Sequence, residues 1–209
     1  MLLSRPSEES PRMFESDFID QFSRTPWLLV PAIHFPIVGV VLWYTTTLGV
    51  SFGITTAAFA VGAVLWTLTE YWLHRTLFHW TPNTPWGPKF HFYSHGVHHK
   101  WHKDPYRLVM PPPISLALAV LFYGLFAAAG KLGALAGVNA GWHYGAFTGF
   151  VVGYVVYDCM HYVLHHWHPK APWMKKLRAH HMAHHHNAAY AEKKFGVSNT
   201  LWDHVFGTY

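Results

Sequence analysis

The chain has 209 residues, enough for one domain, and its 15 Lys and Arg outnumber its 10 Asp and Glu, giving a net charge of +5. Hydrophobic residues make up 51% of the chain and charged residues only 12%, about half the usual charged share. Much of the surface is therefore expected to face lipid, and the positive charge indicates an anionic membrane surface rather than nucleic acid. The single cysteine, Cys159, excludes a disulfide framework and a cysteine-based zinc site.

The first 26 residues are polar and contain no apolar core followed by a small-residue cleavage site, so no secretory signal is expected. We interpret residues 1–26 as a cytoplasmic N-terminal arm. Residues 27–209 are expected to form one membrane-embedded domain.

Four apolar stretches are long enough, or nearly long enough, to cross a bilayer. They cover roughly residues 27–48, 52–73, 114–129 and 142–163. A soluble helical bundle is the alternative, but stretches such as TTAAFAVGAVLW have no polar face. The expected fold is therefore all-α and integral to the membrane, with four transmembrane helices and a cytoplasmic helical cap.

Basic residues give the orientation. With four spans, the N-terminus, the long segment between spans two and three, and the C-terminus all lie on one side of the membrane. Of the Lys and Arg residues only Lys131 falls on the other side. The positive-inside rule then makes the shared side cytoplasmic.

Ten of the 19 histidines are grouped at the ends of spans two and four and in the segments that follow them. They are His74, His79, His95, His98, His99, His161, His165, His181, His184 and His185. Positions i, i+3 and i+4 share one face of an α-helix, so each H-x-x-H-H group directs three imidazoles one way. We interpret the ten as metal ligands and the isolated histidines as packing or surface residues. His166, His180 and His186 adjoin the candidates and are alternatives if the register is wrong.

His74 and His79 fit an ideal helix less well, because a spacing of five separates two side chains by about 140°. This pair requires an unwound helix end or ligands that reach around the helix. Ten imidazoles exceed what one ion can use, so two metal ions are expected. Imidazole suits iron, zinc, copper and nickel, and the ligand type does not distinguish them. No catalytic side chain apart from the metal ligands is predicted.

Two carboxylates lie close to these groups in the sequence. Glu70 precedes His74 by one turn, and Asp158 precedes His161 by three residues. We interpret both as acceptors for the outer ring nitrogen of a ligand histidine. The alternative is a salt bridge at a helix end, with Arg75 or Arg178 as partner.

The order H-x4-H, H-x2-H-H, H-x3-H, H-x2-H-H resembles the integral-membrane fatty acid hydroxylase and sterol desaturase superfamily, and most closely its fatty acid 2-hydroxylases. The strings DPYRLVMPP, YDCMHYVLHH and GVSNTLWDHVFGT support the resemblance, which covers about residues 65–209. It implies a non-haem di-iron monooxygenase that uses O₂ to hydroxylate carbon 2 of a fatty acyl chain. The substrate would be a free fatty acid or the N-acyl chain of a ceramide-type sphingolipid. Zinc could replace iron in the isolated protein.

The first 26 residues are too short for the b-type cytochrome domain that many eukaryotic members carry, and they lack its H-P-G-G motif. We therefore expect no haem in this chain and a separate electron donor, either a b-type cytochrome or a ferredoxin with an NAD(P)H reductase. The same observation favours a bacterial inner membrane over the endoplasmic reticulum.

Two other functions stay open at this point. The chain could catalyse another reaction of the superfamily, as a sterol, sphingoid-base or carotenoid hydroxylase or a desaturase. It could also be a histidine-rich metal transporter, although transporters place their ligands near the bilayer midplane at broken helices. The grouped histidines here lie at span ends and beyond.

Overall fold

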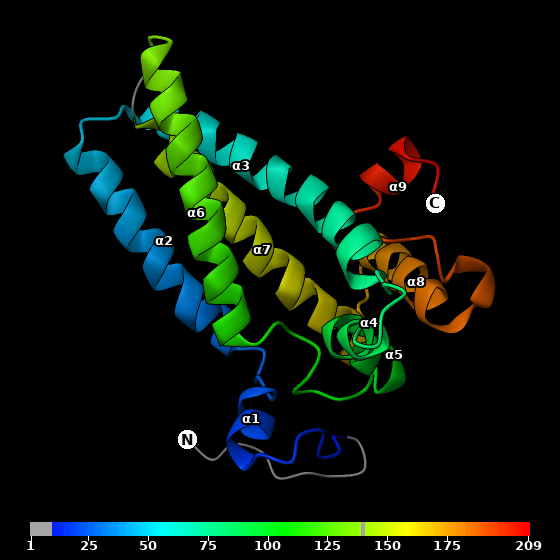
Figure 1. Ribbon diagram of the computed structural model, residues 1–209. Helices are drawn as coiled ribbons and strands as arrows, with labels where there is room; N and C mark the ends of the chain where they lie inside the picture. The colour runs from blue at the N-terminus through cyan, green and yellow to red at the C-terminus, as the bar shows by residue number, and fades with distance from the viewer. Residues whose placement is uncertain (1–9, 139–140) are drawn as a thin grey trace. The chain divides into compact units, whose positions relative to one another are not determined.

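The computed structural model describes residues 10–138 and 141–209, and this part of the chain is helical without strands. Residues 1–9 of the predicted N-terminal arm lie outside the described residues. The helices are α1 (Asp17–Phe22), α2 (Leu29–Thr47), α3 (Phe52–Trp72), η1 (Leu73–Phe78), α4 (Gly87–His91), η2 (Phe92–Gly96), α5 (Val97–Lys100), α6 (Pro112–Leu135), α7 (Trp142–His166), α8 (Pro172–His186), η3 (Ala188–Tyr190) and α9 (Leu201–Val205). Figure 1 shows their arrangement.

The four predicted spans are confirmed as long apolar helices. Within the described ranges, the candidate spans are Leu29–Thr47, Phe52–Phe78, Pro112–Leu135 and Trp142–His166. The third is longer than expected. Pro112 begins it, since proline is tolerated in the first helical turn, and it continues through Gly130 to Leu135.

Contacts along the chain divide it into two compact units, each described here by itself. The span unit contains Leu28–Thr67 and Pro112–Val156, and the histidine unit contains the described residues up to Trp27 together with Leu68–Pro111 and Tyr157–Tyr209. Helices α3 and α7 contribute residues to both units. The predicted division at residue 26, into an arm and one membrane-embedded domain, stays a prediction.

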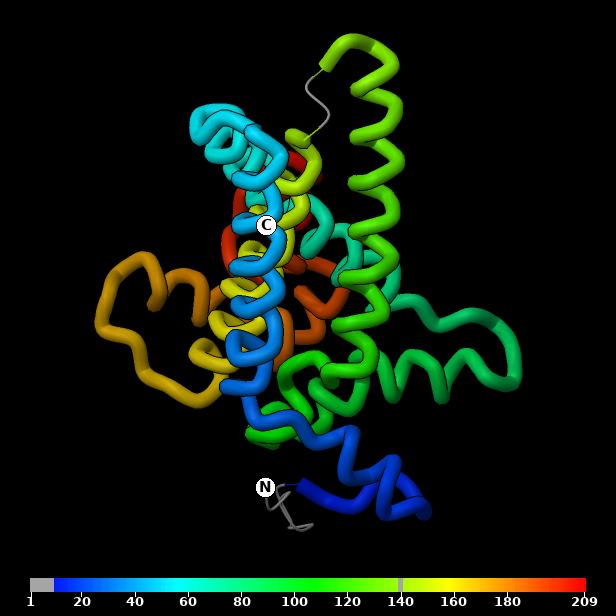
Figure 2. Tube along the Cα trace, turned by 90° about the vertical axis from the view of Figure 1, so that its left-hand side faces the viewer, coloured from blue at the N-terminus to red at the C-terminus, as the bar shows by residue number. Residues whose placement is uncertain are grey.

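Within the span unit, α7 is the central helix (Figures 1 and 2). Some 61% of its most apolar window is buried, against 17% for the windows of α3 and α6. Val38 of α2 packs with Phe147 and Val151 of α7, and Phe126 of α6 joins the cluster. The outward side chains of α3 and α6 are apolar as well, for example Val64 and Val120. Such a surface suits lipid rather than water.

Three glycines spaced four residues apart let α7 approach α3 closely. Gly145, Gly149 and Gly153 lie on one face of α7, and a Cβ atom on each would collide with α3. At Gly149 the obstacle is the backbone of Phe59, which cannot rotate away. Small residues at this spacing are typical of close helix contacts in membranes, where dispersion rather than hydrophobicity drives packing.

We predict that Gly149→Ala destabilises the span unit by about 1–3 kcal/mol, the usual effect of overpacking a tight contact. Thermal unfolding of the purified protein in detergent measures the effect as a lower midpoint. Gly124→Ala in α6 is the matched control, because a Cβ there has no atom within 4 Å. Equal midpoints for the two variants would contradict this account of the contact.

Candidate metal centre

Ten buried or half-buried histidines of the histidine unit gather in two groups. In each group, every ring contributes a nitrogen that lies within 4.8 Å of those of the other members. The first group contains His74, His79, His95, His99 and His184, and the second contains His98, His161, His165, His181 and His185. The structure thus brings together the ten histidines named from the sequence; their role as metal ligands stays a prediction.

A local change of helix type explains how His74 and His79 meet. The helix α3 continues as a π-helix, η1, from Leu73 to Phe78. A π-helix bonds each residue to the one five positions away, so its wider turn brings side chains five apart back toward the same face. The ring centroids of His74 and His79 are 5.3 Å apart. The distortion expected from their spacing is therefore a widened turn rather than an unwound end.

Each H-x-x-H-H motif serves both groups. His95 and His99, four residues apart, join the first group, whereas His98 between them joins the second. In α8 the pattern reverses, because His181 and His185 join the second group and His184 joins the first. Four residues turn a helix by nearly a full circle, so i, i+4 pairs stay together, while the ring at i+3 is offset by about 60° from the first and about 100° from the second.

The distances between ring nitrogens fit a metal ion. Seven pairs of Nε2 atoms lie 2.8 to 3.2 Å apart, including His74–His95 at 3.1 Å and His98–His161 at 2.9 Å. Two imidazole nitrogens bound at right angles to an ion about 2.1 Å away would be separated by about 3.0 Å. The donor set and its spacing therefore fit a first-row transition metal in each group.

Burial keeps these imidazoles neutral. Outside the spans, burial together with neighbouring imidazoles lowers the pKa of His99 to about 3 and that of His184 to about 4. Burial and adjacent rings also place the pKa values of His95, His98 and His181 well below the usual value. A neutral imidazole has a free nitrogen lone pair, which is the form that binds metals.

The two predicted carboxylate acceptors have other partners in the structure. Glu70 is buried and accepts hydrogen bonds from the backbone N–H groups of Val197 and Ser198, both at 2.8 Å, and from the Ser198 hydroxyl. Asp158 accepts from the N–H of Met110 at 3.0 Å. These bonds anchor backbone segments whose pairing with Glu70 or Asp158 no sequence pattern indicates. Arg75, one of the two partners named for the alternative salt bridge, donates to the Tyr71 hydroxyl at 2.9 Å.

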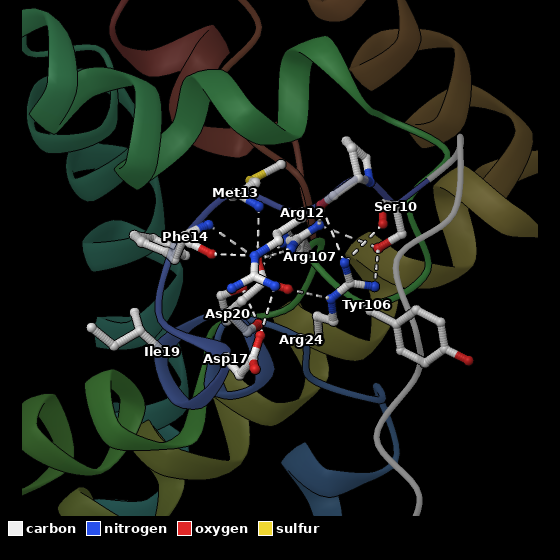
Figure 3. Close-up of polar contacts among 12 residues, drawn as sticks. Ser10, Arg12, Met13, Phe14, Asp17, Ile19, Asp20, Arg24, Tyr106 and Arg107 are labelled. Atoms are coloured by element: carbon white, nitrogen blue, oxygen red, sulfur yellow. Dashed lines mark hydrogen bonds and ion pairs between the residues drawn. The ribbon is translucent and has the colours of Figure 1, made fainter.

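The loop between α5 and α6 is fixed from two sides, by Asp158 at Met110 and by the N-terminal arm at Arg107. Arg107 donates to Asp20 at 3.0 Å, to Asp104 at 3.2 Å and to the carbonyl of Pro11 at 2.7 Å. Figure 3 shows this network, which also includes an ion pair between Asp20 and Arg24 at 3.1 Å. Residues 10–26 of the predicted arm thus belong to the histidine unit.

One buried hydrogen bond between two side chains beside the second H-x-x-H-H group was not expected. His180 lies 3.0 Å through Nε2 from the carboxylate of Asp203, and both side chains are buried. This pairing distinguishes His180 from its neighbour His181, whose Nε2 faces the second group at 2.8 Å from that of His165. No motif spacing links Asp203 to the histidines, so its burial beside His180 could not be predicted from the sequence.

Comparison with known proteins supports the resemblance. A family model described as fatty acid hydroxylase matches residues 59–208. The chain belongs to the fatty acid hydroxylase family. Because the family consists of hydroxylases, the protein is a membrane oxidoreductase, and the alternative of a metal transporter is rejected. Family members depend on metal, in agreement with the two histidine groups.

Several family members are similar over most of the chain. Dihydroceramide fatty acyl 2-hydroxylase FAH2 of Arabidopsis thaliana is 40% identical over 96% of this chain and 80% of its own length. Fatty acid 2-hydroxylase of Rattus norvegicus is 36% identical over 98% of this chain and 58% of its own. Both are eukaryotic, so they give no support to the expected bacterial inner membrane.

The fold of the family is known from full-length scs7p, of which only the hydroxylase domain is visible. That structure matches with a TM-score of 0.84 and 36% identity, covering 96% of this chain and 72% of the other. The match confirms the predicted all-α membrane fold with its histidine clusters.

We predict that the metal-free protein loses stability as the pH falls from 6.5 toward 4. In this window unfolded histidines bind protons, whereas buried rings such as His99 and His184 stay neutral until about pH 3 and 4. Because the unfolded state then binds more protons, the free energy of unfolding decreases by about 1.4 kcal/mol per pH unit for each such ring. Denaturant titrations of chelator-treated protein in detergent measure the slope. A flat profile between pH 6.5 and 4.5 would contradict the neutral state assigned to these rings.

Proposed function

We propose that this protein hydroxylates carbon 2 of a fatty acyl chain at the membrane surface, with the ten histidines holding two iron ions. The observation that supports this most is the convergence of two sets of five neutral imidazoles at ligand spacing. When bound, a pair of iron ions would supply the activation of O₂ at the expense of two electrons. The electrons would come from a separate b-type cytochrome or ferredoxin system. Zinc is the expected contaminant of the isolated protein.

The chain's own residues prepare this site in three ways. Buried imidazoles such as His74 and His181 hold their nitrogens at fixed distances and exclude water. Their neutral state leaves lone pairs free for two cations. The surrounding aromatic rings, among them Phe78 and Phe195 beside the first group, give the site dry walls that limit side reactions.

The position of the histidines in the sequence supports a lipid substrate. His74 lies near the end of the span Phe52–Phe78, and His161 and His165 lie in the last turns of the span Trp142–His166. The acyl tail would then remain in the apolar part of the membrane while its carbonyl end reaches the histidines at the membrane surface. We propose the cytoplasmic face for this interface, supported by the basic residues that flank the spans on that side.

The N-acyl chain of a ceramide-type sphingolipid is the substrate class we favour. Its basis is the similarity to a dihydroceramide fatty acyl 2-hydroxylase and to the ceramide very long chain fatty acid hydroxylase SCS7 of Saccharomyces cerevisiae, which is 39% identical over 92% of this chain and 48% of its own length. A free fatty acid is the alternative outcome of the experiment below.

Expression in a host that lacks acyl 2-hydroxylation tests the proposal. We expect lipids carrying one additional oxygen atom at carbon 2 of their acyl chains, found by mass spectrometry of intact and hydrolysed lipids. Enrichment in sphingolipids identifies an N-acyl substrate, and enrichment in the free acid pool identifies the alternative. Membranes without a new 2-hydroxy acyl product, despite a suitable electron donor and metal-loaded protein, would refute the proposed reaction.

We predict that His98→Ala and His184→Ala each abolish this product and lower the metal content of the purified protein. The two variants test one ligand from each group, and the loss of a ligand leaves the ion undercoordinated. His168→Ala is the matched control, because His168 is exposed and belongs to neither group. Full product and full metal content in either variant would remove that residue from the ligand set.

A further inference from the structure

Backbone carbonyl groups of the C-terminal segment hold two histidines of the first group. The Nδ1 of His74 lies 2.6 Å from the carbonyl oxygen of Phe195, and the Nδ1 of His184 lies 2.7 Å from that of Lys193. A carbonyl oxygen can only accept, so in both neutral rings Nδ1 carries the proton. The lone pair is then on Nε2, the atom that faces the other nitrogens of the group.

The N–H ends of the same two peptide groups are also held. The carbonyl of Phe195 shares its peptide with the N–H of Gly196, which donates to the carboxylate of Asp203 at 2.8 Å. The carbonyl of Lys193 shares its peptide with the N–H of Lys194, which donates to the carbonyl of Thr208 at 2.7 Å. Each peptide group therefore makes two hydrogen bonds in series. Its C=O accepts from a histidine ring, and its N–H donates to an acceptor near the C-terminus. Hydrogen bonds in such a chain polarise and strengthen one another.

Asp203 is the centre of this arrangement. Its carboxylate is fully buried and also accepts from the N–H of Phe195 at 2.9 Å, the hydroxyl of Thr208 at 2.8 Å and Nε2 of His180 at 3.0 Å. Glu70 secures the next two peptide N–H groups, those of Val197 and Ser198. The position of the Phe195 carbonyl is thus determined by two carboxylates.

The second group lacks a comparable support. Its five outer nitrogens, the Nδ1 atoms, are all buried, and none has a hydrogen-bond partner within the described part of the chain. In the first group, by contrast, His79 adds a contact of 3.5 Å between Nδ1 and the carboxylate of Glu192. The two groups offer similar ligands to a metal but differ in what fixes those ligands.

We propose that Asp203 is a positioning residue for the first group: through the Gly196–Phe195 peptide it fixes the tautomer and orientation of His74, so the first group retains its ion longer than the second. The inference rests on the proposed role of the ten histidines as ligands of two ions. Partners of the outer nitrogen of ligand histidines typically change metal affinity by about 10–100-fold.

Release of metal from the full-length protein to a chelator tests the inference. We expect the wild type to contain two ions per chain and to release them in two phases, with the slow phase lost in His74→Ala and the fast phase lost in His161→Ala. Asp203→Asn keeps the shape of the side chain but removes its charge and half of its acceptor capacity. It should accelerate the slow phase by about 10–100-fold and leave the fast phase unchanged.

Gly196→Ala disturbs the same peptide without changing any charge. A Cβ there would collide with the carbonyl oxygen of Asn199 and lie 2.7 Å from the Asp203 carboxylate, so we expect the same selective effect on the slow phase. Gly124→Ala, with no atom within 4 Å of its Cβ, is the control and should release both ions as the wild type does.

The outcomes separate the inference from the proposed function. Wild-type release of both phases from Asp203→Asn and Gly196→Ala overturns the role of Asp203 and leaves the ligand assignment intact. Equal acceleration of both phases in the two variants also overturns it, because the effect then belongs to the fold as a whole. A metal-loaded wild type with fewer than two ions per chain would instead overturn the two-ion site itself.

Discussion

The structure of the histidine unit depends on the close approach of uncharged imidazole nitrogens. Pairs of Nε2 atoms such as His165–His181, at 2.8 Å, are stable only if a proton or a cation lies between them, because two lone pairs repel. Charging the rings would replace that repulsion by a stronger one between cations in a medium of low dielectric constant. The π-helical turn at Leu73–Phe78, the arm at Arg107 and the C-terminal segment all hold backbone in positions that make this approach possible. Metal binding and folding are therefore expected to be coupled in this unit.

Sequence patterns predicted the ten histidines of the two groups but not how they divide. Composition and apolar length were sufficient for the four spans, and the spacing i, i+3, i+4 was sufficient to orient each motif. The crossing of His98 and His184 to opposite groups depends on how α5 and α8 face each other. That is a tertiary relation, and no local spacing encodes it. The π-helical turn was predicted only as a distortion, because helix type responds to the ligands and carbonyls around it as much as to propensity.

The main-chain hydrogen-bond partners were harder to predict from the sequence than the grouping of the histidines. Glu70 and Asp158 were expected to accept from ligand histidines, and that role stays a prediction; the contacts seen for both are with peptide N–H groups, at Val197 and Met110. The acceptors for His74 and His184 are main-chain carbonyls, which every residue possesses and which therefore leave no trace in a sequence. Side chains that hold such carbonyls in place act on the histidines only indirectly, through the backbone. Asp203 belongs to this class, and its burial near the chain end is visible only in three dimensions.

The division of each H-x-x-H-H motif between the two groups also limits how the protein can evolve. One residue inserted or deleted ahead of His181 within α8 would rotate the following rings by about 100° and displace members of both histidine groups at once. The segment between α7 and α8, from 167 to 171, carries none of the ten grouped histidines and is free of that constraint. Changes in chain length should therefore be tolerated between the histidine-bearing helices and eliminated within them.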